Sequence, residues 1–113
     1  MTYSLVFSKQ AETDLIEILQ YTLDNFGERQ YWIYRDLIKE AVDLITSDPT
    51  YIASRARNEL AKGARSYHIS RPGVKASHFL LYRINESEKQ VELGRILHES
   101  VDTHRHLPSN FPR

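Results

Sequence analysis

The stretch KQAETDLIEILQYTLDNFGERQYWIYRDLIKEAVDLITSDP, residues 9–49, predicts two consecutive helices and thereby decides the fold. Ser8, just before it, suits the N-cap position because its hydroxyl can accept a hydrogen bond from a free amide of the first turn. Gly27 supplies the left-handed residue that ends the first helix. Asp48-Pro49 ends the second helix, since proline disfavours a helical residue before it. Two helices joined by so short a turn form an antiparallel hairpin.

Each helix carries a wide apolar face at helical spacing, which we expect to be buried. In the first helix this face consists of Ala11, Leu15, Ile18, Leu19, Thr22, Leu23 and Phe26. In the second helix, expected from about Glu28 to about Ser47, the face consists of Tyr31, Tyr34, Leu37, Ile38, Ala41, Leu44 and Ile45. Trp32 adds aromatic bulk beside it, and we expect Trp32 to pack in the core, with contact to a partner as the alternative.

Short strands are predicted on both sides of the hairpin from alternating and β-branched or aromatic residues. They cover Thr2–Phe7, Arg65–Ser70, Ser77–Asn85 and Gln90–Leu97, with a turn at Arg71-Pro72-Gly73. Gly94 is expected to mark a bulge in the last strand. The order strand–helix–helix–strand–strand–strand is typical of an α+β domain, in which the helical hairpin packs on one face of a small, mostly antiparallel sheet.

The remaining segments have weaker patterns. Residues 51–63 are expected to form a loop with a helical turn, and Val101–Leu107 a short terminal helix. The tail from about residue 108 is expected to be loose. With 113 residues and no linker or repeat, the chain is predicted to be one domain over residues 1–113.

Charge is unevenly distributed although the formal net charge is zero. Residues 1–50 carry four Lys/Arg and nine Asp/Glu, a balance of −5, whereas residues 51–113 carry eleven and six, a balance of +5. Such asymmetry favours a basic face that meets an acidic or polyanionic partner, with an unevenly charged solvated surface as the alternative. The absence of cysteine fits a reducing cytoplasm, and no apolar run is long enough to span a membrane.

Polar side chains that could carry chemistry collect on the three predicted C-terminal strands. They are Arg65, Tyr67, His68, His78, Tyr82, Arg83, Arg95 and His98. Arginine, tyrosine and histidine together can bind phosphates and move protons, as a metal-independent ribonuclease requires. Alternate residues of a strand face opposite sides, so these eight do not all share one face. The competing interpretation is structural side chains lying over a small sheet.

Neither a metal nor a cofactor is predicted. The histidines His98, His104 and His106 have no spacing known from a closed zinc site, and the four glycines lie too far apart for a phosphate-binding loop. No nucleophile motif accompanies the histidines.

Several motifs together resemble the ParE/RelE toxin superfamily, and its ParE branch in particular. The run from Phe7 to Leu15 is similar to a family opening in which a strand leads into an A-x-x-D-L helix, and Ile16–Gly27 resembles its continuation. The segment 60–67 is similar to an L-x-x-G-x-R entry into the sheet. Residues 78–98 resemble the H-x-x-x-Y-R…V-x-I-x-R-I-L-H ending, and Asp102 fits an acidic position after it. The resemblance covers about residues 3–108.

This resemblance implies a cytoplasmic toxin neutralised by a small antitoxin that folds across it. The ribonuclease branch, which cleaves messenger RNA on the ribosome, carries lysines and arginines on its central strands. Here His68, Ser70 and Phe79 stand at positions where such residues are expected. The ParE-like branch lacks those residues and poisons DNA gyrase by trapping its complex with cleaved DNA, so a gyrase poison is the first hypothesis. The alternative is a ribosome-dependent ribonuclease that uses His68, Arg65, Arg83, Arg95 and His98, and a non-toxic family member is a third possibility.

The site and partners expected from the resemblance can be stated by residue. The predicted target-binding residues are Arg65, Tyr82, Arg83, Arg95 and His98. Arg83 and Arg95 have a structural alternative, in which they hold the C-terminal segment by hydrogen bonds. The expected partners are a ParD-like antitoxin on the helical hairpin and strand edge, DNA gyrase as target, and operator DNA only through the antitoxin. A heterotetramer or larger toxin–antitoxin complex is expected.

Overall fold

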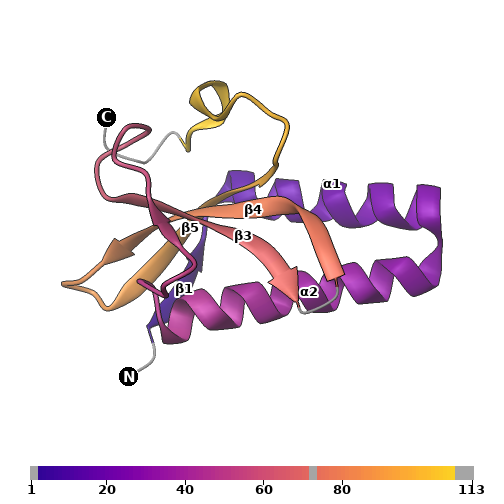
Figure 1. Cartoon of the computed structure of the whole chain (residues 1–113), viewed down its shortest axis with the longest axis horizontal. Helices are drawn as coiled ribbons and strands as arrows, with labels where there is room; N and C mark the ends of the chain where they lie inside the picture. The colour runs from indigo at the N-terminus through magenta and orange to yellow at the C-terminus, as the bar shows by residue number, and fades with distance from the viewer. Residues whose placement is uncertain (1–2, 72–73, 109–113) are drawn as a thin grey trace.

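Two antiparallel helices pack against a five-stranded sheet in the computed structural model, which describes residues 3–71 and 74–108 (Figure 1). Helix α1 spans Lys9–Phe26 and helix α2 spans Glu28–Ser47. The strands are β1 (Ser4–Phe7), β2 (Arg55–Ala56), β3 (Ala64–Arg71), β4 (Val74–Asn85) and β5 (Gln90–His98), followed by a 3-10 helix at Thr103–His106. Their order in the sheet is β1-β5-β4-β3-β2, with β1 parallel to β5 and every other pair antiparallel. The predicted α+β class and mostly antiparallel sheet are confirmed.

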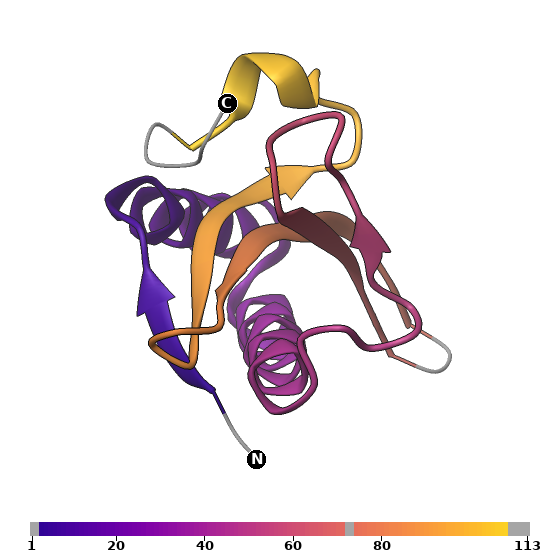
Figure 2. The same cartoon turned by 90° about the vertical axis from the view of Figure 1, so that its left-hand side faces the viewer.

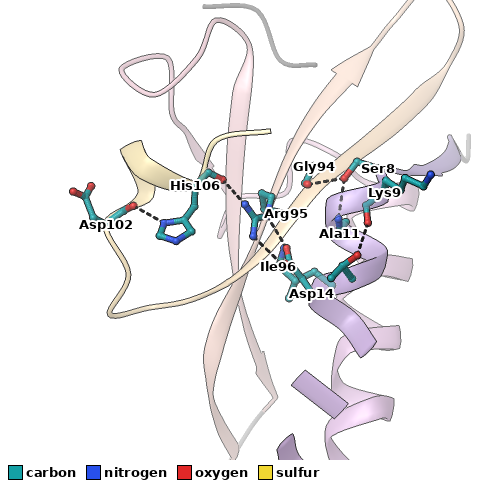
Figure 3. Close-up of polar contacts among 10 residues, drawn as sticks. Ser8, Lys9, Ala11, Asp14, Gly94, Arg95, Ile96, Asp102 and His106 are labelled. Carbon is teal, nitrogen blue, oxygen red and sulfur yellow. Dashed lines mark hydrogen bonds and ion pairs between the residues drawn. The ribbon is translucent and has the colours of Figure 1, made fainter. Parts of the chain in front are cut away.

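The helix ends form as their residues predict. The Ser8 hydroxyl accepts a hydrogen bond from the Ala11 amide at 2.9 Å, and it donates to the Gly94 carbonyl oxygen at 2.7 Å (Figure 3). Gly27 adopts φ = 90°, in the region that favours glycine, and its N–H donates to the Leu23 carbonyl oxygen. One residue therefore ends α1 and turns the chain directly into α2.

The far halves of the two helices extend beyond the sheet, and there the predicted apolar faces are not buried (Figure 1). Leu23 and Phe26 were expected in the core, but they are 39% and 65% exposed. The expectation that Trp32 packs in the core is also wrong, because 50% of its surface is exposed. Sequence periodicity marks which side of a helix is apolar, but it does not show where the covering sheet ends.

Apolar clusters form on both faces of the sheet. The larger lies between the helices and the sheet and includes Leu37, Ile45, Tyr67, Leu80 and Leu93. The second lies on the opposite face and consists of Leu60, Ala61, Ala64, Phe79, Leu81 and Leu97, with Val101 and Leu107 packed against it. Figure 2 shows the turn between β2 and β3 and the C-terminal segment above that face, with the helices on the other side. Both faces of the sheet are therefore covered.

Three local predictions, for Gly94, for residues 51–63 and for the C-terminal tail, have different outcomes. The Gly94 bulge is confirmed: Leu81 pairs with Arg95 and Tyr82 with Leu93, which leaves Gly94 without a partner across the ladder. The 51–63 segment, expected to be a loop, also contains the two-residue strand β2. The loose tail expected from about residue 108 stays a prediction, although the side chain of Pro108 itself is fully buried. Thr2, Pro72-Gly73 and residues 109–113, which carry parts of other predictions, lie outside the described residues.

Candidate functional site

Arg95 lies on β5 just past the point where strand β1 ends (Figure 3). Because β1 pairs only with residues 90–93, the edge of β5 beyond them has no neighbouring strand. The Asp14 carboxylate of α1 takes the place of that strand by accepting the Ile96 N–H at 3.0 Å. The same carboxylate accepts two hydrogen bonds from Arg95, from Nε and Nη2, each at 2.8 Å. These bonds tie the first turns of α1 to the edge of the sheet.

Arg95 also reaches the C-terminal segment. Its Nη1 donates to the His106 carbonyl oxygen at 3.2 Å, so one guanidinium joins α1, β5 and the 3-10 helix. The side chains of Arg95 and Asp14 are only 15% and 9% exposed, and the hydrogen bonds to Asp14 raise the pKa of Arg95. These contacts agree with the structural alternative for Arg95, in which it holds the C-terminal segment. Its role in target binding stays a prediction.

Arg83 and Arg65 are held in separate surroundings. Two nitrogens of Arg83 donate to Glu92 Oε1, Nε at 2.8 Å and Nη2 at 2.5 Å, across the β4–β5 pair. Arg65 Nη2 donates to the Ser54 hydroxyl at 2.7 Å, and within the described part of the chain its buried Nε has no hydrogen-bond partner. Each of these arginines is thus fixed by a different neighbour.

Tyr82 is a core residue. Its side chain has no exposed surface, and its hydroxyl donates to the Pro49 carbonyl oxygen at 2.6 Å. The prediction that Tyr82 contacts a target is therefore wrong. The alternation of β4 explains the error, since Leu80 and Tyr82 both face the helices and the chain after α2 closes over the tyrosine ring.

His98 borders a groove of about 540 Å³ between the helical hairpin and the ends of β4 and β5. Its walls include Tyr21, Phe26, Tyr34 and His78. Tyr34 Oη accepts a hydrogen bond from the Ser77 N–H at 3.3 Å and is also hydrogen-bonded to His78 Nδ1. The Ser100 N–H donates to His98 Nδ1 at 3.0 Å. Because His98 Nδ1 accepts from a backbone N–H, the neutral form of this ring carries its proton on Nε2.

Burial shifts the pKa values of two side chains that line this groove. The pKa of His78 is lowered from 6.5 to about 4, mainly because burial disfavours its charged form and secondarily because His98 lies beside it. Burial also raises the pKa of Tyr34. The charged residue that lines the groove is Glu17, and no lysine or arginine lines it among the described residues. The groove therefore suits an apolar, neutral or basic group better than a phosphate.

The low pKa of His78 predicts a loss of stability in acid. An unfolded histidine binds its proton near pH 6.5 whereas folded His78 binds it near pH 4. The unfolded chain thus holds more protons between these values, so this contribution to stability is complete above about pH 6.5 and disappears as the pH falls through about 4. We expect the urea midpoint of the wild type to fall more steeply over this window than that of His78→Gln. Equal slopes would show that His78 does not contribute.

The five predicted site residues do not form one surface. Arg65, Tyr82 and His98 lie on the side of the sheet that faces the helices, as Tyr67 and Leu80 do. The others, Arg83 and Arg95, lie on the opposite side with Leu81 and Leu97. His68 of the ribonuclease alternative also lies on that opposite side and contacts Glu99 at 2.9 Å. Contact with a target therefore stays a prediction for each of the other four residues separately: Arg65, Arg83, Arg95 and His98.

Sequence reasoning overlooked Asp14 and the groove pair Tyr34–His78. Asp14 had a usable signal, because it is the aspartate of the A-x-x-D-L motif, and its place on the apolar side of α1 called for a buried partner. Tyr34 and His78 had no comparable signal, since 44 positions of sequence separate them. No group of three or more histidine, cysteine or acidic side chains within residues 3–71 and 74–108 is arranged to hold a metal ion.

The family described as "ParE toxin of type II toxin-antitoxin system, parDE" matches residues 5–103. The chain belongs to the ParE toxin family. The ParE resemblance of its motifs is thus confirmed, and the chain is the toxin of a type II toxin–antitoxin system. No curated protein sequence matches this ParE family member.

Solved structures share the ParE fold of this chain. One, described as the chromosomal ParDE toxin–antitoxin system from P. aeruginosa, has a TM-score of 0.69 at 20% identity and covers 86% of this chain and 96% of its own. Another, described as the toxin–antitoxin complex RelBE2 from Mycobacterium tuberculosis, has a TM-score of 0.59 at 22% identity and covers 89% and 95%. At such identities these similarities establish the fold alone. In the described part of this ParE chain, neither helix is long and apolar enough to cross a membrane.

Proposed function

We propose that this ParE family toxin acts by binding DNA gyrase in the cytoplasm and trapping its complex with cleaved DNA. The observation that carries the proposal is the dispersal of the residues a ribonuclease would need. Arg95 is engaged by Asp14 and Arg83 by Glu92, and the two lie across the sheet from Arg65 and His98. A binding protein needs no convergent acid–base pair, whereas phosphodiester cleavage does.

A cellular experiment tests this target. The toxin is expressed without its antitoxin in two otherwise identical strains, one with its own gyrase and one with gyrase replaced by an insensitive form. We expect growth to stop only in the first strain, with its messenger RNA intact. Equal growth arrest in both strains would overturn the proposal.

A second candidate function, cleavage of messenger RNA on the ribosome, has one observation in its favour. Tyr34, His78 and His98 meet in one groove, and phenol and imidazole groups are among the side chains that transfer protons in enzymes. The lack of a cation among the described lining residues weighs against it, because the developing phosphorane charge needs stabilisation. Fragmented transcripts that disappear with His98→Gln would favour this candidate.

We further propose that a cognate antitoxin covers the protruding end of the hairpin. Tyr21, Phe26 and Trp32 are 62%, 65% and 50% exposed, and exposed aromatic groups of this kind mark protein contacts. The two solved structures described above are toxin–antitoxin systems, which supports such a partner. A complex of two toxins and two antitoxins, or a larger one, is the expected assembly.

A further inference from the structure

The 51–70 segment concentrates positive charge at the edge of the sheet opposite β1. It carries four cationic side chains and one carboxylate, namely Arg55, Arg57, Lys62, Arg65 and Glu59. The hairpin, residues 9–47, carries four cations and eight carboxylates. In Figure 1 the 51–63 segment lies at the end of the molecule away from the turn between α1 and α2. Residues 51–70 thus carry an excess of basic side chains and the hairpin an excess of acidic ones.

Three of these cations, which we call the basic edge, lie on strand β2 or on the turn that joins it to β3: Arg55, Arg57 and Lys62. Arg55 on β2 pairs with Ser66, and Arg57 Nη1 donates to the Ser66 hydroxyl at 3.2 Å, so both arginines belong to the sheet face opposite the helices. Lys62 lies in the turn that enters β3. Arg65 is not part of the basic edge, because it faces the helix side and binds Ser54.

The basic edge keeps much of its charge available. Arg55 and Lys62 are exposed, and neither forms an ion pair within the described part of the chain. Arg57 contacts Glu59 at 2.7 Å, and that glutamate is itself 59% exposed. The hydrogen bond from Arg57 lowers the pKa of Glu59, and the charges of Arg57 and Arg55 add to this effect. The two arginines therefore act together on a negative group beside them.

We infer that the basic edge binds the phosphate backbone of duplex DNA, namely the segment held by gyrase. This inference rests on the proposed function, which supplies that DNA. Guanidinium and ammonium groups are the side chains that contact phosphate oxygens, and such contacts place a protein on DNA without reading its sequence. The difference in charge between residues 51–70 and the hairpin favours an approach in which the basic edge meets the polyanion first.

A protein partner fits the basic edge less well. Cores of protein interfaces are apolar and aromatic and contain little lysine. Within residues 51–70 the one large apolar side chain that is well exposed is Ile52, at 94%. Within residues 3–71 and 74–108, the exposed aromatic groups lie instead on the hairpin, at Tyr21, Phe26 and Trp32. An acidic protein segment is therefore treated as a competing outcome of the test.

Fluorescence anisotropy with the full, antitoxin-free chain and a short labelled duplex tests the inference. Three phosphate contacts predict that the logarithm of the binding constant falls with the logarithm of salt concentration with a slope of about −2.7. Removing two contacts with Arg55→Gln/Lys62→Gln should reduce the slope to about −0.9 and weaken binding on the order of tenfold per contact near 0.1 M salt. Operator and scrambled duplexes should bind equally, because phosphate contacts carry no sequence information.

The matched control is Arg29→Gln/Lys39→Gln, which removes one arginine and one lysine from exposed positions of the hairpin. This variant loses two positive charges, as Arg55→Gln/Lys62→Gln does, but it retains the basic edge. It should therefore keep the wild-type slope. Equal slopes for both double variants would overturn the inference. Preference for the operator duplex, or for a polyglutamate peptide over DNA, would overturn it as well.

The gyrase reaction separates this inference from the proposed function. The Arg55→Gln/Lys62→Gln variant should trap less cleaved DNA than the Arg29→Gln/Lys39→Gln variant at equal concentration. If neither the wild type nor any variant traps cleaved DNA, but the salt slopes of DNA binding differ as expected, the gyrase target is wrong and the surface assignment stands. If DNA is trapped equally by both variants, the surface assignment is wrong and the target stands.

Discussion

Asp14→Ala is expected to lower the free energy of unfolding by about 3–5 kcal/mol, the usual cost of removing one partner from a buried ion pair. The substitution leaves the Arg95 guanidinium, 15% exposed, without its carboxylate. It also leaves the Ile96 N–H without its acceptor at the edge of β5. The Arg95 bond to the His106 carbonyl oxygen remains but cannot neutralise the charge. Urea unfolding followed by circular dichroism measures the loss.

Asp43→Ala is the matched control for this prediction. Asp43 also pairs with a cation, Lys39 at 2.9 Å, but the two side chains are 64% and 65% exposed. Solvent screens such pairs, so we expect a change of at most about 0.5 kcal/mol. The double variant Asp14→Ala/Arg95→Met should recover part of the loss because no unpaired charge remains. A cost for Asp14→Ala no larger than that of the control would contradict this account of the β5 edge.

Tyr82→Ala is expected to lower the free energy of unfolding by about 3–5 kcal/mol, because it empties a fully buried aromatic site between the helices and the sheet. Tyr82→Phe keeps the ring but removes the donor to the Pro49 carbonyl oxygen, and it should cost about 1–3 kcal/mol. Urea unfolding of both variants checks these values.

Tyr21→Phe provides the control for the hydroxyl effect. Tyr21 is 62% exposed, so water can replace any interaction of its hydroxyl, and we expect a change within about 0.5 kcal/mol. If Tyr82→Phe were as stable as the wild type, the bond to Pro49 would not contribute to holding the segment that follows α2.

The helical hairpin and the three C-terminal strands could be predicted because their signals are local. Ser8 and Gly27 set the ends of α1 by bonds to residues a few positions away, and the missing side chain of Gly94 marked the bulge. Strand β2 could not be predicted in this way, since two residues have no periodicity and form a strand only because β3 lies beside them. The apolar cluster on the second face depends likewise on contacts distant in sequence.

For the site, the sequence identified residue types but not their neighbours. Arg95 was recognised, yet its partner Asp14 lies 81 positions away on another element. Tyr82 was selected because it stands in the Y-R motif of the family, and only the packing of α2 and its following loop buries it. The opposite error occurred at Trp32, where an aromatic residue typical of cores lies on a part of the hairpin that the sheet does not cover.

The measurement that tests the central proposal most directly uses purified, antitoxin-free toxin and gyrase from the same host. Supercoiled DNA is incubated with both proteins and ATP, denaturant is added, and linear DNA is scored. The proposal predicts that linear DNA accumulates with toxin concentration and that none appears without gyrase. The absence of linear DNA, from toxin that is folded and stops growth in cells, would contradict it and direct attention to the ribosome.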